Sequence, residues 1–172
     1  MNRPVLALIA TAVLGALGGC SGSKAGPTIN NKMSGSDQPP AAATVSSVVS
    51  SDILAREPIA NTATVKHILI SWHDLGEQFG GRLDPRADKR SKADAEAEVR
   101  SLLKQLQDGA DFDAVMKAHS EDLGSAMSGR TFTVTPDAQL VIEFRQLSLR
   151  LRPGEFGVCQ SDFGFHIIKR FS

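Results

Sequence analysis

The sequence has few of the residues that would build a cross-linked or nucleic-acid-binding fold. Its 172 residues contain two cysteines, which excludes a disulfide-rich scaffold and argues against a structural zinc site. Lys and Arg together number 19, as do Asp and Glu. The sequence therefore lacks the excess of positive charge that would indicate nucleic-acid binding. No apolar run reaches the roughly 18 residues of a transmembrane helix. Tyrosine is absent, and all Trp and Phe residues lie between Trp72 and Phe171, which predicts a core in the C-terminal part.

The N-terminus has the features of an export signal. Arg3 precedes an apolar stretch over residues 5–16, which ends in the sequence LGGC with Cys20 as its last residue. This ending resembles the lipobox of bacterial lipoproteins, and the resemblance implies cleavage after residue 19 and a diacylglycerol on Cys20. Ser21, by resemblance to enterobacterial sorting rules, implies the periplasmic face of the outer membrane. The alternative is an ordinary secretory signal with an incidental cysteine.

Residues 20–61 are rich in small and polar side chains, which bury too little apolar surface to offset the entropy of ordering. We therefore expect the lipidated Cys20 to be followed by a flexible linker. Within it, residues 51–56 are expected to form a helical turn that docks on the domain, ended by Pro58. The folded domain is predicted to occupy residues 62–172.

The domain is predicted to have α+β architecture. The β-branched run at 63–72 predicts a central strand, and a glycine-punctuated loop follows at 74–90. Helices are expected from Ser91 to Gly109, from Asp111 to about His119, and over about 137–151, with a turn-rich stretch at 120–135. Two strands near 156–160 and 164–171 close the chain. This order predicts helices packed around an antiparallel sheet.

Several segments of the domain, taken together and in this order, resemble the parvulin-type peptidyl-prolyl cis/trans isomerases. The resemblance covers roughly residues 63–170. The segments that carry it are KHILI (66–70), DGADF (108–112), HSED (119–122), GSA (124–126), QLVIEF (139–144), LRPGE (151–155) and FGFHIIK (163–169).

The resemblance implies a four-stranded antiparallel sheet surrounded by about four helices. It also implies isomerisation of X-Pro bonds in secreted and envelope proteins that are folding, without a metal or a cofactor. His67, Asp122 and His166 match the catalytic positions of the family. The substrate proline ring would be received by Phe132, Leu140 and Phe144.

Two alternatives remain open from the sequence. Family members usually carry G-G-D-L-G-x-F where this chain has GRTFTVT at 129–135. This departure favours a catalytically weak or inactive parvulin-fold chaperone that binds clients from its lipid anchor. The basic loop at 82–92 is either a solvated loop or a surface that binds an acidic client segment or a lipid headgroup. In some parvulins, by resemblance, a basic patch on the equivalent loop reads acidic or phosphorylated residues before proline.

Overall fold

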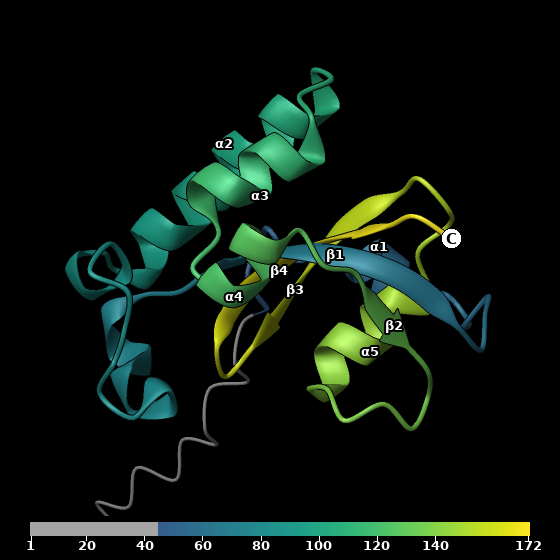
Figure 1. The fold of residues 1–172 in the computed structure, drawn as a ribbon, viewed down its shortest axis with the longest axis horizontal. Helices are drawn as coiled ribbons and strands as arrows, with labels where there is room; N and C mark the ends of the chain where they lie inside the picture. The colour runs from purple at the N-terminus through teal and green to yellow at the C-terminus, as the bar shows by residue number, and fades with distance from the viewer. Residues whose placement is uncertain (1–44) are drawn as a thin grey trace, which may run out of the picture. The chain divides into compact units, whose positions relative to one another are not determined.

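The computed structural model describes residues 45–172, so the expected signal peptide, the lipidation site Cys20 and the linker up to residue 44 lie outside the described residues. The fold is built on a four-stranded antiparallel sheet with strand order β2-β1-β4-β3 (Figure 1). Its strands are β1 (Ala63–Ile70), β2 (Phe132–Val134), β3 (Phe156–Ser161) and β4 (Gly164–Arg170). The α+β class with an antiparallel sheet is therefore confirmed.

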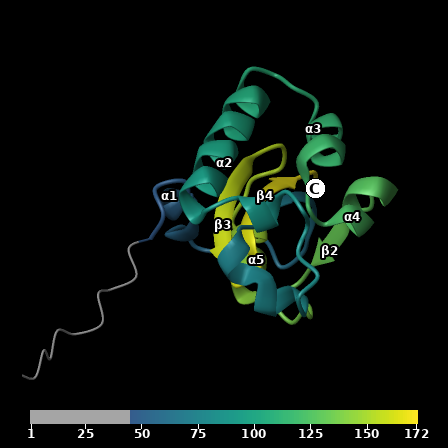
Figure 2. The same ribbon diagram turned by 90° about the vertical axis from the view of Figure 1, so that its left-hand side faces the viewer.

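Helices cover both faces of this sheet (Figures 1 and 2). The helices α2 (Lys92–Gln107) and α3 (Phe112–His119) pack on one face, and α5 (Ile142–Ser148) packs on the other. Because side chains alternate along a strand, each face has its own apolar cluster. The α2 face includes Ile68, Ile70, Val158, Phe165 and Ile167, and the α5 face includes Val65, Cys159 and Ile168.

The ends of the first two long helices follow from local hydrogen bonds. Ser91 and Asp94 form a reciprocal capping box at the start of α2, as the sequence predicts. Gly109 follows its last turn with φ at 97°, a conformation that glycine adopts without steric cost. Asp111 then caps α3 through the N–H of Ala114.

The stretch 120–135 differs from its prediction as a turn-rich linker. It contains a helix, α4 (Leu123–Ser128), and the edge strand β2. The side chain of Asp122 accepts a hydrogen bond from the N–H of Ser125, which starts the helix, and Gly129 ends it at φ 64°. The short run of β2 is stabilised by pairing with Ala63–Val65 of β1 rather than by its own pattern.

The last helix is shorter than the predicted span of 137–151. The residues before Ile142 form a turn, in which Thr135 donates to the side chain of Asp137 and the N–H of Leu140 bonds to Ala138. The loop at 74–90 contains two 3-10 segments, η1 (His73–Phe79) and η2 (Ala87–Lys89). The described residues thus hold five α-helices, close to the expected number of about four. Within residues 45–172 none of these is both long and apolar enough to cross a bilayer.

Residues 45–61 pack on the domain, whereas the sequence prediction extends the linker through residue 61. They include the predicted helical turn, α1 (Ser51–Leu54). Val48 is buried on the α2 face of the sheet and Ile53 on the α5 face, so the segment wraps around the outer edge of β3. Ser50 exchanges hydrogen bonds with the N–H and C=O of Val158, which satisfies edge groups that no strand covers.

Candidate active site

Two histidines meet on the α5 face of the two central strands. His67 lies on β1 and His166 on β4, offset by two residues along the strands, because Leu69 pairs with His166 and His67 with Ile168. Their Nδ1 atoms are 3.2 Å apart, and their rings stack with centroids 5.3 Å apart. Both side chains are buried. The sheet thus places two titratable rings in direct contact within an apolar layer.

The hydrogen bonds around the two rings indicate which ring nitrogens carry a proton. Nε2 of His67 lies 2.9 Å from Oδ2 of Asp122, a carboxylate that only accepts, so this nitrogen carries a proton. The Nδ1 atom of His67 accepts from Nδ1–H of His166. Nε2 of His166 then accepts from the hydroxyl of Ser161, at 2.8 Å. The chain of hydrogen bonds therefore runs from Ser161 through both rings to Asp122.

The pKa shifts of His166 and Asp122 agree with this arrangement of hydrogen bonds. Burial in the protein interior lowers the pKa of His166 to about 3, and the charge of a protonated His67 would lower it further. The hydrogen bond from His67, with two more from the backbone and hydroxyl of Ser125, holds the pKa of Asp122 well below its usual range despite partial burial. At neutral pH, His166 is uncharged and Asp122 is a carboxylate.

An apolar pocket opens beside this hydrogen-bonded chain. The rings of Phe132 and Phe144 meet the ring of His67 edge-on, with centroids 5.3 and 5.2 Å away. Leu140, from the turn before α5, lines the same cavity of about 260 Å³. A cavity of this size accommodates a five-membered ring and its peptide backbone.

The structure brings all six sequence-predicted site residues together around this one pocket: His67, Asp122, Phe132, Leu140, Phe144 and His166. Four further lining residues were missed from the sequence: Arg130, Gln139, Val141 and Phe163. Phe163 belongs to the turn between β3 and β4, and its aromatic character beside His166 was a usable signal. Arg130 gave the other signal, since it stands in the segment that departs from the family pattern.

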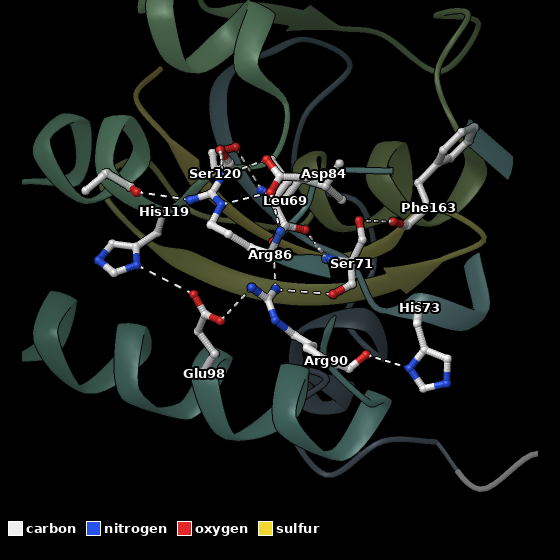
Figure 3. A network of polar contacts seen from close by, with 12 residues as sticks. Leu69, Ser71, His73, Asp84, Arg86, Arg90, Glu98, His119, Ser120 and Phe163 are labelled. Carbon is white, nitrogen blue, oxygen red and sulfur yellow. Dashed lines mark hydrogen bonds and ion pairs between the residues drawn. The ribbon is translucent and has the colours of Figure 1, made fainter. Parts of the chain in front are cut away.

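A network of arginines places the residues that precede Asp122 (Figure 3). The N–H of Leu69 donates to the hydroxyl of Ser120, and the N–H of Glu121 donates to the C=O of Leu69. Glu121 also accepts from the N–H of Ser71 and from Arg90, at 2.6 and 2.7 Å. These bonds fix the segment against the end of β1 and thereby place Asp122 beside His67.

The same network occupies the charged side chains of the 82–92 loop. Arg86 pairs with Asp84 and donates to the C=O groups of Ala118 and Ser120. Arg90 pairs with Glu121 and Glu98 (Figure 3). Burial raises the pKa of Glu121, although the bonds from Ser71 and Arg90 oppose that shift. Two of the basic residues of the loop therefore have internal partners.

The remaining titratable side chains that the sequence offered lie elsewhere. His119 contacts Glu98 at 3.6 Å, at the end of α3. Cys159 is buried on β3, and burial raises the pKa of its thiol. A second cavity, of about 280 Å³, borders Cys159 at the outer edge of β3 but contains no histidine. Residues 45–172 contain no group of three or more His, Cys, Asp or Glu side chains placed to hold a metal ion.

Comparison with known proteins gives one consistent relationship. A family model described as the PPIC-type PPIase domain matches residues 51–171. The chaperone SurA of Saccharophagus degradans is 30% identical over 115 residues, which are 66% of this chain and 24% of the chaperone. The foldase protein PrsA of Geobacillus kaustophilus is 27% identical over 108 residues, which are 62% of this chain and 38% of the foldase.

The likeness extends to solved structures. The peptidyl-prolyl isomerase ESS1 from Candida albicans superposes with a TM-score of 0.54 at 17% identity, over 65% of this chain and 63% of that one. At this identity the likeness concerns the fold. The matched stretch spans about a quarter of the length of the curated chaperone and just over a third of the foldase.

Proposed function

The chain belongs to the PPIC-type PPIase family, the parvulins, and we propose that it is a peptidyl-prolyl cis/trans isomerase that assists the folding of extracytoplasmic proteins. The observation that supports this best is the apolar pocket lined by Phe132, Leu140 and Phe144 directly beside the hydrogen-bonded pair His67 and His166. The printed names of two relatives, a chaperone and a foldase, support a role in protein folding.

The chemistry asked of the pocket is rotation about one bond. Resonance gives the X-Pro bond partial double-bond character and a barrier of roughly 20 kcal/mol. In the twisted transition state this resonance is lost, so the amide is less polar than either planar form. An apolar wall that grips the ring binds the twisted form better than the planar ones, and each 1.4 kcal/mol of this preference accelerates the reaction about tenfold.

In this proposal the polar residues hold the pocket ready for the twisted amide. The chain from Ser161 through His166 and His67 to Asp122 fixes the orientation of both rings, so that their faces and edges line the pocket in one arrangement. A fixed set of dipoles stabilises the transition state without reorganising during the reaction. No nucleophile is required, because no bond is formed or broken.

We further propose that the domain works from a lipid anchor in the bacterial cell envelope, on the periplasmic face of the outer membrane. The support comes from the sequence, where an apolar stretch ends at Cys20 and Ser21 follows it. Mass spectrometry of the N-terminal peptide from the native host tests this proposal. Diacylglycerol on Cys20 is expected, and an unmodified thiol or a different cleavage site would contradict it.

The experiment that tests the enzymatic proposal is NMR exchange spectroscopy on X-Pro peptides with the full chain in detergent solution. Accelerated exchange between cis and trans signals is expected. The second candidate function is a catalytically inactive or nearly inactive chaperone, which the departure at 129–135 favours. Under that alternative, exchange stays at the uncatalysed rate while the folded protein still slows the aggregation of an unfolded client.

A further inference from the structure

Arg130 lies at the mouth of the pocket and places a positive charge next to its apolar wall. It follows α4 and precedes β2, and it lines the same cavity as His67 and Asp122. Its guanidinium stands 4.8 Å from the centroid of the Phe132 ring. This cation–π contact places the guanidinium beside the ring that forms one wall of the pocket, where Arg is favoured over Lys.

The positive charge of Arg130 has no acidic partner in the part of the chain that the structure describes. Asp122, the carboxylate of the same cavity, is occupied by His67 and Ser125. The arginines of the neighbouring loop, Arg86 and Arg90, are paired inside the network of Figure 3. Arg130 is therefore the arginine lining this pocket whose charge is available to a ligand.

A guanidinium that contacts an aromatic ring can still donate hydrogen bonds from its N–H groups. Those N–H groups match the two oxygens of a carboxylate, which they bind with two parallel hydrogen bonds. The peptide on either side of the substrate proline must pass the mouth of the pocket, where Arg130 and the exposed Gln139 lie. A carboxylate that reaches this mouth meets the cation of Arg130.

We propose that Arg130 is a specificity-determining residue that selects client segments carrying Glu or Asp directly beside the proline. This inference rests on the proposed isomerase function, because the selected ligand is its substrate. It assigns the preference to the turn between α4 and β2 and not to the 82–92 loop. It also gives a role to one residue in the segment that departs from the family pattern.

The test compares peptides that differ only in one charge. NMR exchange gives the catalysed rates for Glu-Pro, Gln-Pro, Pro-Glu and Pro-Gln peptides with the full chain at low ionic strength. At least one acidic peptide is expected to exceed its amide counterpart about three- to tenfold in kcat/KM, since exposed charge-assisted bonds have this size. The ratio is expected to fall in high salt, which screens the interaction.

Variants then assign the preference to its residue. Arg130→Gln is expected to bring the ratio close to one, and Arg130→Lys to retain part of it. The matched control is Arg82→Gln, which removes another exposed arginine without an ion pair in the described residues and is expected to keep the ratio. Thermal unfolding of each variant shows that the domain is intact.

Three results would overturn the inference. Equal rates for both pairs of peptides would contradict the selection itself. An equal loss in Arg82→Gln would show a general effect of positive charge. No exchange with any peptide would contradict the isomerase function, and with it this inference, whereas exchange at equal rates contradicts only the role of Arg130.

Discussion

The Nδ1 atoms of His67 and His166 face each other at 3.2 Å between the two central strands. One proton at most fits between them, so each ring fixes the tautomer of the other. The bonds at the two outer nitrogens, to Asp122 and Ser161, complete the assignment. Through this shared hydrogen bond, His166 on β4 helps to fix the orientation of the His67 ring in the pocket.

The neutral state of His166 makes stability depend on pH. Its pKa is about 3 in the folded protein, where burial disfavours the cation, against 6.5 ordinarily. As the pH falls below about 6.5, the unfolded chain binds a proton at this ring and the folded chain does not. The free energy of unfolding is therefore expected to fall by about 1.4 kcal/mol per pH unit from this group between pH 6 and 3.

Chemical denaturation at several pH values measures this slope, and His166→Gln serves as the comparison. The variant is expected to show a slope shallower by about 1 kcal/mol per pH unit. Ring nitrogen shifts of the unmodified protein give an independent reading, with His166 neutral at pH 5. A cationic His166 at pH 5 would contradict the assigned chain of hydrogen bonds.

Asp122 has two separable roles, which two substitutions distinguish. Its Oδ1 caps α4 and its Oδ2 accepts from His67. Asp122→Ala removes both and is expected to cost about 1 kcal/mol in stability as well as turnover. Asp122→Asn keeps a capping oxygen, so its stability is expected to stay within about 0.5 kcal/mol, while loss of the charge lowers the isomerase rate.

Thermal unfolding and peptide exchange on the same two variants check this separation. If Asp122→Asn unfolds as readily as Asp122→Ala, the cap is not the source of the stability. If Asp122→Asn keeps full turnover, the carboxylate charge has no role beside His67.

The buried pair Arg90 and Glu121 is expected to matter more for stability than the surface pairs of the protein. The side chain of Glu121 is 2% exposed and that of Arg90 is 11% exposed. Arg90→Met leaves the carboxylate buried without its cation, which costs about 3 kcal/mol. The control is Lys104→Met, since Lys104 forms an exposed pair with Asp108 that contributes less than about 1 kcal/mol.

Urea denaturation of both variants measures the difference. The proton bound by an uncompensated Glu121 would also make the Arg90→Met variant more stable at pH 5 than at pH 7, relative to the unmodified protein. Equal effects of the two substitutions would contradict a structural role for the network in Figure 3.

The segment before the sheet is expected to contribute to stability as part of the domain. Ile53 is 5% exposed and Ile59 is 51% exposed, although both lie within the predicted linker. Ile53→Ala is expected to cost about 2–4 kcal/mol and Ile59→Ala less than about 0.5 kcal/mol. Denaturation curves of the two variants check this, and an Ile53→Ala variant as stable as Ile59→Ala would contradict the packing of α1 on the sheet.

The sequence predicted the parts of the fold that have strong local patterns. β1 has a continuous β-branched run, and α2 has both a capping box and an apolar stripe, so each was predicted within a few residues. β2 and α4 were missed because three residues of β2 acquire their structure by pairing with Ala63–Val65, and six residues of α4 depend on one side chain, Asp122.

The candidate site was predicted through resemblance more than through pattern. No periodicity indicates that His67 and His166, 99 positions apart, share a hydrogen bond. Arg130 was quoted as a departure from the family and received no role, because its position over Phe132 depends on the turn at Gly129. The helical turn that contains Ile53 was expected to dock on the domain, whereas the burial of Val48 was missed because the composition around it is that of a linker.

The measurement that tests the central claim most directly is X-Pro exchange with two leucine variants of the full chain. Leu140 lines the pocket, and Leu103 is a partly buried leucine packed on the opposite face of the sheet. Leu140→Ala is expected to lower the catalysed rate at least tenfold, which corresponds to a loss of about 1.4 kcal/mol of transition-state stabilisation. Leu103→Ala is expected to lower the rate less than about twofold, because Leu103 does not line the pocket. Equal rates in the two variants, from folded protein, would contradict the placement of the proline ring in this pocket.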